Sequence, residues 1–253
     1  MHLRSIVTLV AVSLIAPAAF TQDPQISAPS LDELVAKNVE AKGGADALRA
    51  LQSLRRTGKL LLDDGQLQLT YSQVKKRPLE VRTEVAIQGM TAVQAFDGKE
   101  GWRISPFQGR KDPERMSADD VKSLMEDAEM DGPLVDWKAK GSTVEYLGME
   151  DVDGTQAHKF KVARKNGDVN FVYLDPDHFL EIRILTQRIE QGAQVEVETD
   201  LGDYEKISRV FVPFSIESGR KGDPSKQKVV IDKAEGNVPV DDATFHFPTT
   251  ASK

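Results

Sequence analysis

The stretch EVRTEVAIQ, residues 80–88, gives the clearest indication of the fold of this chain. Apolar or β-branched side chains stand at every second position from Val81 to Ile87, and charged or polar side chains stand at most positions between them. Successive side chains of a β-strand point to opposite faces of a sheet. The alternation therefore predicts a strand that has one buried face.

Most of the chain on either side shows the same period of two. The alternating segments lie around residues 66–71, 159–163, 169–173, 180–184, 195–199, 210–216 and 229–231. Asp-Gly and Asn-Gly pairs, which favour tight hairpin turns, separate several of them. No helix lies between successive strands, as parallel βαβ units would require. We therefore expect a mainly β protein with some α, in which about eleven strands form an antiparallel meander.

Helical periodicity is confined to two regions. The first begins at Ser30, where a Ser-x-x-Glu pattern ending at Glu33 predicts a capping box, and it ends at Gly43-Gly44 with a short helix after it. The second region begins near Ser117 and places Leu124 and Ala128 on one helical face. The sequence thus predicts two or three helices.

The apolar face of the predicted sheet is wider than these helices can cover. Strands lie about 4.8 Å apart, so eleven of them span about 50 Å, whereas three helices side by side cover about 30 Å. A second sheet, closure into a barrel, or curvature into a half-barrel capped by helices would each bury the remainder. Only the curled arrangements leave room for a cavity, and an apolar cavity of this kind suits acyl chains.

Ten residues of the alternating segments are candidates for the wall of such a cavity, and the alternative for each is ordinary packing in a filled core. The two tyrosines and the tryptophan are included because aromatic rings offer large contact areas at low entropic cost. The candidates are Leu69, Tyr71, Val81, Val85, Trp102, Phe160, Phe171, Tyr173, Ile182 and Ile184.

The N-terminal residues predict export. Arg4, the apolar run 6–15 and the small residues 16–19 form the pattern of a secretory signal peptide, which we assign to residues 1–21. The apolar run is too short to span a bilayer as a helix. We expect a flexible segment at 22–29, a single domain at 30–248 and a tail at 249–253, in a mature protein that is soluble in the periplasm.

Composition and motifs exclude several classes of function. The chain has no cysteine, which excludes disulfides, thiol nucleophiles and a lipidated cysteine anchor, and its net charge of −7 disfavours nucleic-acid binding. Its four histidines lack the spacing of metal ligands, and no nucleophile elbow or phosphate-binding loop is present. We predict no catalytic residues, no metal and no cofactor.

Short motifs along the chain resemble those of a known superfamily. They are AKGG at 41–44, ADALRAL at 45–51, FDG at 96–98, GW at 101–102, YLD at 173–175, GDY at 202–204, VP at 212–213 and NVPVDDATF at 237–245. Their order is similar to that of the outer-membrane lipoprotein-sorting protein superfamily, the periplasmic lipoprotein carriers and their relatives. The resemblance implies an incomplete, half-open antiparallel β-barrel with helices over its open side, and a hydrophobic cavity that takes lipoprotein acyl chains.

The function implied is that of a non-enzymatic periplasmic carrier, which binds lipid or lipoprotein acyl chains for transfer toward the outer membrane. Its partners would be an inner-membrane donor and an outer-membrane acceptor, with only transient membrane contact. A lipid-sensing or protein-interaction module on the same fold is the first alternative. An envelope hydrolase is the second, because paired carboxylates from distant strands can form a site without a local motif.

Overall fold

The computed structural model of the chain describes residues 29–190 and 192–248. The expected signal peptide (1–21), all but the last residue of the segment 22–29, and the tail 249–253 lie outside the described residues. No helix within the described ranges is long and apolar enough to cross a lipid bilayer.

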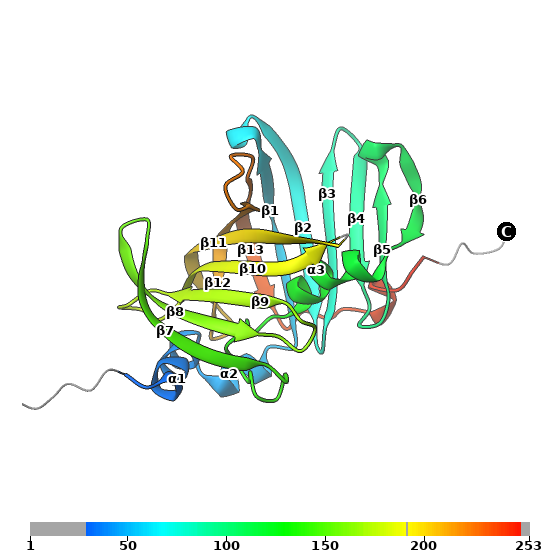
Figure 1. Cartoon of the computed structure of the whole chain (residues 1–253). Helices are drawn as coiled ribbons and strands as arrows, with labels where there is room; N and C mark the ends of the chain where they lie inside the picture. Colours follow the sequence, from blue (N-terminus) through cyan, green and yellow to red (C-terminus); the bar gives the residue numbers. More distant parts are fainter. Residues whose placement is uncertain (1–28, 191, 249–253) are drawn as a thin grey trace, which may run out of the picture.

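One antiparallel sheet of thirteen strands runs through the described part of the chain and stays open at both edges (Figure 1). Its spatial order is β6-β5-β4-β3-β2-β1-β13-β12-β11-β10-β9-β8-β7. The chain enters at β1 in the middle, winds outward to the edge strand β6, crosses to the other edge at β7 and winds back to β13 beside β1. The strands are β1 (Ser53–Leu62), β2 (Leu67–Lys76), β3 (Glu80–Ile87), β4 (Met90–Phe96), β5 (Gly101–Ser105), β6 (Arg110–Arg115), β7 (Thr143–Val152), β8 (Thr155–Ala163), β9 (Val169–Leu174), β10 (Glu181–Glu190), β11 (Ala193–Ile207), β12 (Val210–Arg220) and β13 (Gln227–Gly236).

The sheet curves so strongly that its two halves, β1–β6 and β7–β13, form two walls that face each other (Figure 1). The pairing of β1 with β13 shifts register between Thr57 and Gly58, which is a bulge at the junction of the two walls. A Cβ atom at Gly58 would lie 2.0 Å from the carbonyl oxygen of Val230. Glycine is therefore required where the strands approach closely, and bulges of this kind bend a sheet.

Three helices cover parts of the sheet. Helix α1 (Leu31–Ala41) has the expected capping box between Ser30 and Glu33, and it buries Leu34 against β8 and β9. Helix α2 (Ala45–Ala50) follows directly. Helix α3 (Ala118–Ala128) lies in the crossover between β6 and β7, on the concave side of the sheet (Figure 1). Short 3₁₀ turns occur at Asp63–Gly65, Pro106–Gln108 and Asp242–Thr244.

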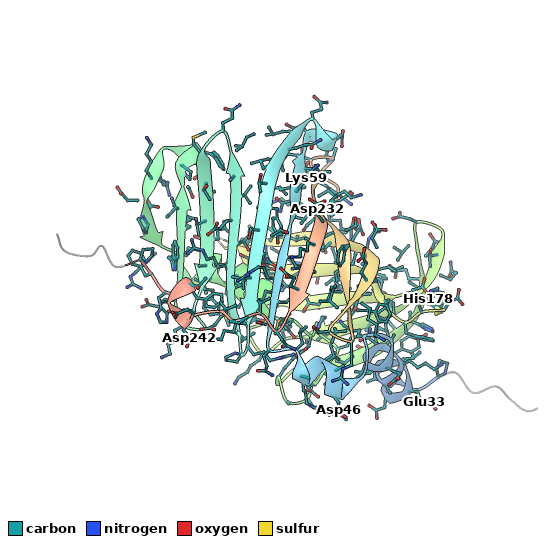
Figure 2. The ribbon with its side chains drawn as sticks, turned by 180° about the vertical axis from the view of Figure 1, so that it is seen from behind. Glu33, Asp46, Lys59, His178, Asp232 and Asp242 are labelled. Carbon is teal, nitrogen blue, oxygen red and sulfur yellow. The ribbon has the colours of Figure 1, made fainter. Side chains whose placement is uncertain are left out.

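The outer face of the sheet carries charged side chains and is partly covered by the C-terminal segment. Figure 2 shows Lys59 of β1 and Asp232 of β13 on this side, and both are exposed. Over β4 and β5, Phe245 is fully buried, and its backbone oxygen accepts a hydrogen bond of 2.7 Å from the indole nitrogen of Trp102. The residues after β13 thus replace a helix as the cover of this region.

The expected fold is confirmed: an open, curved antiparallel sheet with three helices, close to a half-open barrel. The expected number of about eleven strands is too low. Strand β6 has the sequence RKDPER, in which no apolar alternation exists. An edge strand has a neighbour on only one side and tolerates proline, so Pro113 can stand in β6 without breaking a ladder of hydrogen bonds.

Candidate functional site

A cavity of about 690 Å³ lies between the concave face of the sheet and the end of α3. Both walls of the sheet contribute to it, as do α3 and the residues that follow it. Gln94 of β4 and Gln227 of β13 stand in its wall and are exposed, so the cavity communicates with solvent. Its volume lies within the range of about 300–1,000 Å³ that is common for ligand pockets.

The register of the first wall arranges the cavity-facing residues in two rows that cross the strands. The polar row consists of Arg56, Gln73, Thr83 and Gln94, which are paired side by side on β1 to β4. The next row toward the far end of β1 contains Gly58, Tyr71, Val85 and Ala92, and we call it the apolar row. The wall is therefore amphipathic, and its polar side lies nearer to α3.

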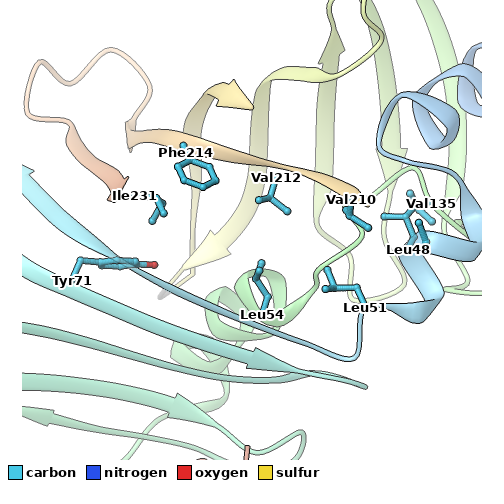
Figure 3. Close-up of a cluster of buried hydrophobic side chains, with 10 residues drawn as sticks. Leu48, Leu51, Leu54, Tyr71, Val135, Val210, Val212, Phe214 and Ile231 are labelled. Carbon is cyan, nitrogen blue, oxygen red and sulfur yellow. The ribbon is translucent and has the colours of Figure 1, made fainter. Parts of the chain in front are cut away.

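Apolar side chains of the two walls meet beside these rows. Figure 3 shows Tyr71 and Leu54 of the first wall opposite Val212 and Phe214 of β12, with Ile231 of β13 between them. All five are buried. Burial raises the pKa of the Tyr71 hydroxyl. This cluster closes the bottom of the cavity at the junction of the walls.

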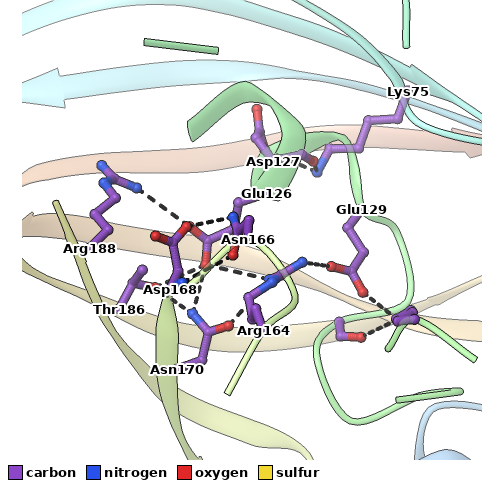
Figure 4. A network of polar contacts seen from close by, with 12 residues as sticks. Lys75, Glu126, Asp127, Glu129, Arg164, Asn166, Asp168, Asn170, Thr186 and Arg188 are labelled. Carbon is purple, nitrogen blue, oxygen red and sulfur yellow. Dashed lines mark hydrogen bonds and ion pairs between the residues drawn. The ribbon is translucent and has the colours of Figure 1, made fainter. Parts of the chain in front are cut away.

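The end of α3 is tied to both walls by three carboxylates, Glu126, Asp127 and Glu129, which we call the acidic latch (Figure 4). Asp127 accepts a hydrogen bond of 2.8 Å from the Gln73 amide and pairs at 3.0 Å with the ammonium group of Lys75, both on β2. Burial lowers the pKa of Lys75, and Asp127 opposes this effect.

The other two carboxylates of the acidic latch face the second wall. Glu126 accepts hydrogen bonds of 2.9 Å from the Asn170 amide on β9 and from the Thr186 hydroxyl on β10. Glu129 pairs at 2.5 Å with Arg164, directly after β8. The latch therefore connects strands that lie on opposite sides of the cavity, and α3 with its latch forms a roof.

A second pocket of about 330 Å³ lies on the other side of this roof. Glu126, Glu129, Met130 and Arg164 line both pockets, so they form the partition between them. Met125 of α3 lines the second pocket and is partly exposed. Two carboxylates of the acidic latch, Glu126 and Glu129, thus separate the two pockets.

A buried ion pair stands at the base of the roof. Lys42, which caps the C-terminal end of α1, lies 2.6 Å from Glu181 at the start of β10, and both side chains are nearly inaccessible to solvent. A Cβ atom at Gly132 would lie 3.0 Å from the Lys42 ammonium nitrogen. The pair therefore joins α1 to the second wall and touches the segment after α3.

The structure brings three of the ten residues predicted for the cavity wall to the cavity: Tyr71, Val85 and Ile184. Leu69 lies two residues from Tyr71 on the same strand and is buried outside the lining. Val81 is fully buried beneath α3, and Phe160 packs with Leu34 beneath α1.

The other four predicted residues lie away from the cavity. Trp102 packs with Phe247 under the C-terminal segment. Phe171 and Tyr173 stand on the face of β9 opposite Val172, and Ile182 packs with them. Alternation identified these strands correctly, but it could not tell which of two apolar faces turns inward, because the C-terminal segment and outer side chains also bury the convex face.

Sequence reasoning missed the polar residues of the cavity, above all Arg56, Gln73 and the acidic latch. Polar side chains in a strand are usually assigned to the exposed face. The spacing of these residues along β2 could have identified them. Gln73 and Lys75 follow Leu69 and Tyr71 at every second position, so all four side chains point to the same, inward face of the strand.

His158 and His178 lie outside the cavity, and neither belongs to a metal site in the described part of the chain. Within residues 29–190 and 192–248, no group of three or more His, Asp or Glu side chains has the geometry to hold a metal ion. His158 contacts the Tyr146 hydroxyl at 3.0 Å, and His178 lies beside Asp175 in an exposed turn. Neither histidine lines the cavity.

Fold and cavity define a class of protein: an open, curved antiparallel half-barrel with a helical roof over a solvent-accessible pocket.

No protein-family model and no curated protein sequence matches the chain. Solved structures do match its fold. A DUF1329 family protein from Desulfovibrio piger has a TM-score of 0.58 at 13% identity, over 85% of this chain and 96% of that one.

Two further solved structures have a similar fold. A domain from Vibrio parahaemolyticus described as an outer membrane lipoprotein-sorting protein domain has a TM-score of 0.55 at 12% identity, over 83% of this chain and 97% of that one. A LolA superfamily protein from Nitrosomonas europaea has a TM-score of 0.55 at 10% identity, over 87% and 98%. The expected resemblance to this superfamily is confirmed at the level of the fold.

Proposed function

We propose that this protein is a non-enzymatic carrier that holds the acyl chain of a lipid or lipoprotein in the cavity beneath α3. The observation that carries the proposal is the cavity of about 690 Å³, whose wall includes Tyr71, Val85 and Ala92 of the apolar row. Each methylene group that leaves water contributes about 0.8 kcal/mol, so one long chain supplies most of the affinity. Binding and release of an acyl chain in this role require no catalysed reaction.

Two observations support a periplasmic place of action: the signal peptide expected at residues 1–21 and the similarity in fold to lipoprotein-sorting proteins. We propose that the mature protein, with the domain 30–248, works in the periplasm and receives its cargo from an inner-membrane donor. It would deliver the cargo to an outer-membrane acceptor and touch membranes only transiently. The acidic latch would hold α3 closed while cargo is bound.

Blocking the cavity tests the proposal. Ala92 lines the cavity, and the neighbouring Thr91 points away from it and is exposed. The Ala92→Phe variant places a ring in the cavity, and Thr91→Phe is the matched control. Nile red, a neutral apolar dye, should bind the wild type and the control, and Ala92→Phe should weaken binding about tenfold or more because the ring occupies the apolar row. Equal binding by all three proteins would refute the proposal.

Two measurements separate the carrier from its alternatives. Mass spectrometry of lipid extracted from gently purified protein should detect an acyl-chain compound. Transfer of that compound to acceptor vesicles, measured against time, distinguishes a carrier from a sensor, which would retain its ligand. Reproducible turnover that is lost on changing one carboxylate or histidine would instead favour a hydrolase.

A further inference from the structure

The charged residues in the cavity wall do not balance. Five basic side chains, those of Lys42, Arg56, Lys75, Arg164 and Arg188, face four acidic ones, those of Glu126, Asp127, Glu129 and Glu181. The wall therefore has one positive charge in excess, although the whole chain has a net charge of −7. This excess positive charge is confined to the cavity wall, and a single residue accounts for it.

That residue is Arg56. Lys42 pairs with Glu181, Lys75 with Asp127, and the other two arginines with the remaining carboxylates of the acidic latch. Among the described residues Arg56 has no acidic partner: one Nη donates to the Gln73 side chain, and its Nε is buried without any hydrogen-bond partner. Only 5% of Arg56 is exposed. A buried cation is unfavourable unless an anion or several acceptors satisfy it.

The carboxylate that Gln73 links to Arg56 is already engaged by other side chains. Asp127 accepts hydrogen bonds from Gln73 and pairs with Lys75, so Gln73 stands between it and Arg56. Glu126 is held by Asn170 and Thr186 on the opposite wall. All four acidic side chains of the cavity wall are thus engaged by residues other than Arg56.

A second donor lies beside Arg56 on the same wall. Tyr71 is two residues from Gln73 on β2 and faces the cavity, and its hydroxyl has no hydrogen-bond partner among the described residues. From there the apolar row continues through Val85 and Ala92. The wall therefore presents a positive charge and a hydroxyl donor at one end of an apolar surface.

We propose that Arg56 and Tyr71 bind the anionic end group, a carboxylate or a phosphate, of a single-chain amphiphile whose hydrocarbon chain lies along the apolar row. The inference rests on the proposed function, since it names the class of ligand that the cavity accepts. A guanidinium and an anionic oxygen form strong, charge-assisted hydrogen bonds in a site shielded from water. Such a ligand satisfies the Arg56 Nε and removes the excess charge of the wall.

The proposed anion site is tested by the displacement of bound Nile red. The competing ligands are three amphiphiles of equal chain length: laurate, dodecyl phosphate and the neutral dodecanol. At a pH at which laurate is ionised, the wild type should prefer at least one anionic amphiphile over dodecanol about tenfold or more, because the ion pair adds to the same apolar contact. The stronger of the two anions identifies the end group as carboxylate or phosphate.

Variants locate the site of this preference. Arg56→Met removes the buried charge, and Arg55→Met removes a charge from the exposed face of the same strand as the matched control. The preference should disappear in Arg56→Met with dodecanol binding retained, and it should persist in Arg55→Met. Tyr71→Phe, which changes a single atom, should reduce the preference severalfold and serves as a second readout independent of Arg56.

The outcomes are distinct for the two proposals. If dodecanol and both anions displace the dye equally well from the wild type, the anion site is refuted and the carrier function stands. If the preference is unchanged in both Arg56→Met and Tyr71→Phe, the site is again refuted. If none of the three amphiphiles displaces the dye, or if the dye does not bind, the proposed function fails together with the inference.

Discussion

Removal of the Lys42 ammonium group, by the Lys42→Met variant, should strongly destabilise the fold. The group lies 2.6 Å from a Glu181 carboxylate oxygen, and the side chains are 9% and 2% exposed. Methionine fills most of the space of lysine but cannot pair with the carboxylate. Glu181 is then left as a buried charge without a counterion, next to the Tyr204 hydroxyl that donates to its backbone oxygen at 2.8 Å.

The expected loss is about 3–5 kcal/mol of unfolding free energy, the usual cost of breaking a buried pair by removing one partner. For a domain of this size, each kcal/mol lowers the melting temperature by about 2–4 °C, so the midpoint should fall by about 6–20 °C. Urea denaturation, followed by tryptophan fluorescence, gives the free energy. A thermal scan by circular dichroism gives the midpoint.

A double variant and a surface control complete the test. Lys42→Met combined with Glu181→Leu replaces both charges by apolar groups and should recover most of the loss. Lys59→Met removes an exposed lysine from the outer face and should change stability by less than about 0.5 kcal/mol. A loss below about 1 kcal/mol in Lys42→Met, or no recovery in the double variant, would refute the view that this pair is buried and isolated from water.

Three further predictions concern the roof, the junction of the walls and pH. Glu126→Gln weakens the acidic latch and should speed the release of Nile red about fivefold or more in stopped-flow measurements. Glu145 is exposed, so the control variant Glu145→Gln should release the dye at the wild-type rate. Equal release rates for Glu126→Gln and the wild type would count against the latch. Gly58→Ala places a Cβ atom 2.0 Å from the Val230 carbonyl oxygen and should cost at least about 3 kcal/mol in denaturant titrations, and a change below about 1 kcal/mol would contradict this. Burial lowers the pKa of His158 below its ordinary value of 6.5, so the unfolded chain binds a proton more readily than the folded chain, and stability is lost as the pH falls below 6.5. The His158→Gln variant should reduce this loss of unfolding free energy in denaturation curves recorded between about pH 7.5 and pH 5. An unchanged dependence on pH would exclude His158 as its source.

Much of the fold was predictable from local patterns in the sequence. The alternation in β3, the capping box at Ser30 and the helix after Ser117 all correspond to elements of the structure. These signals arise from contacts between neighbours in the sequence, so they need no knowledge of the tertiary arrangement. Strand β6 escaped detection because an edge strand with the sequence RKDPER has no apolar face.

The candidate site was harder to predict, because its character depends on which residues meet across the cavity. Alternation places Tyr71 and Trp102 equally well in a buried face, yet one faces the cavity and the other is covered by the C-terminal segment. The polar row is visible only when β1–β4 are aligned in register. No local pattern pairs Arg56 with Gln73 or Glu126 with Thr186, which are 60 positions apart.

The crossover that carries α3 has a mechanical consequence for the protein. It is the only covalent link between the edge strands β6 and β7 in the described part of the chain, and it also forms the roof. Because α3 is joined to both edge strands through this crossover, a swing of α3 away from the cavity would act on both edges of the sheet. If a ligand enters beneath α3, the segment from Met116 to Ser142 would therefore couple its entry to movement of both edge strands.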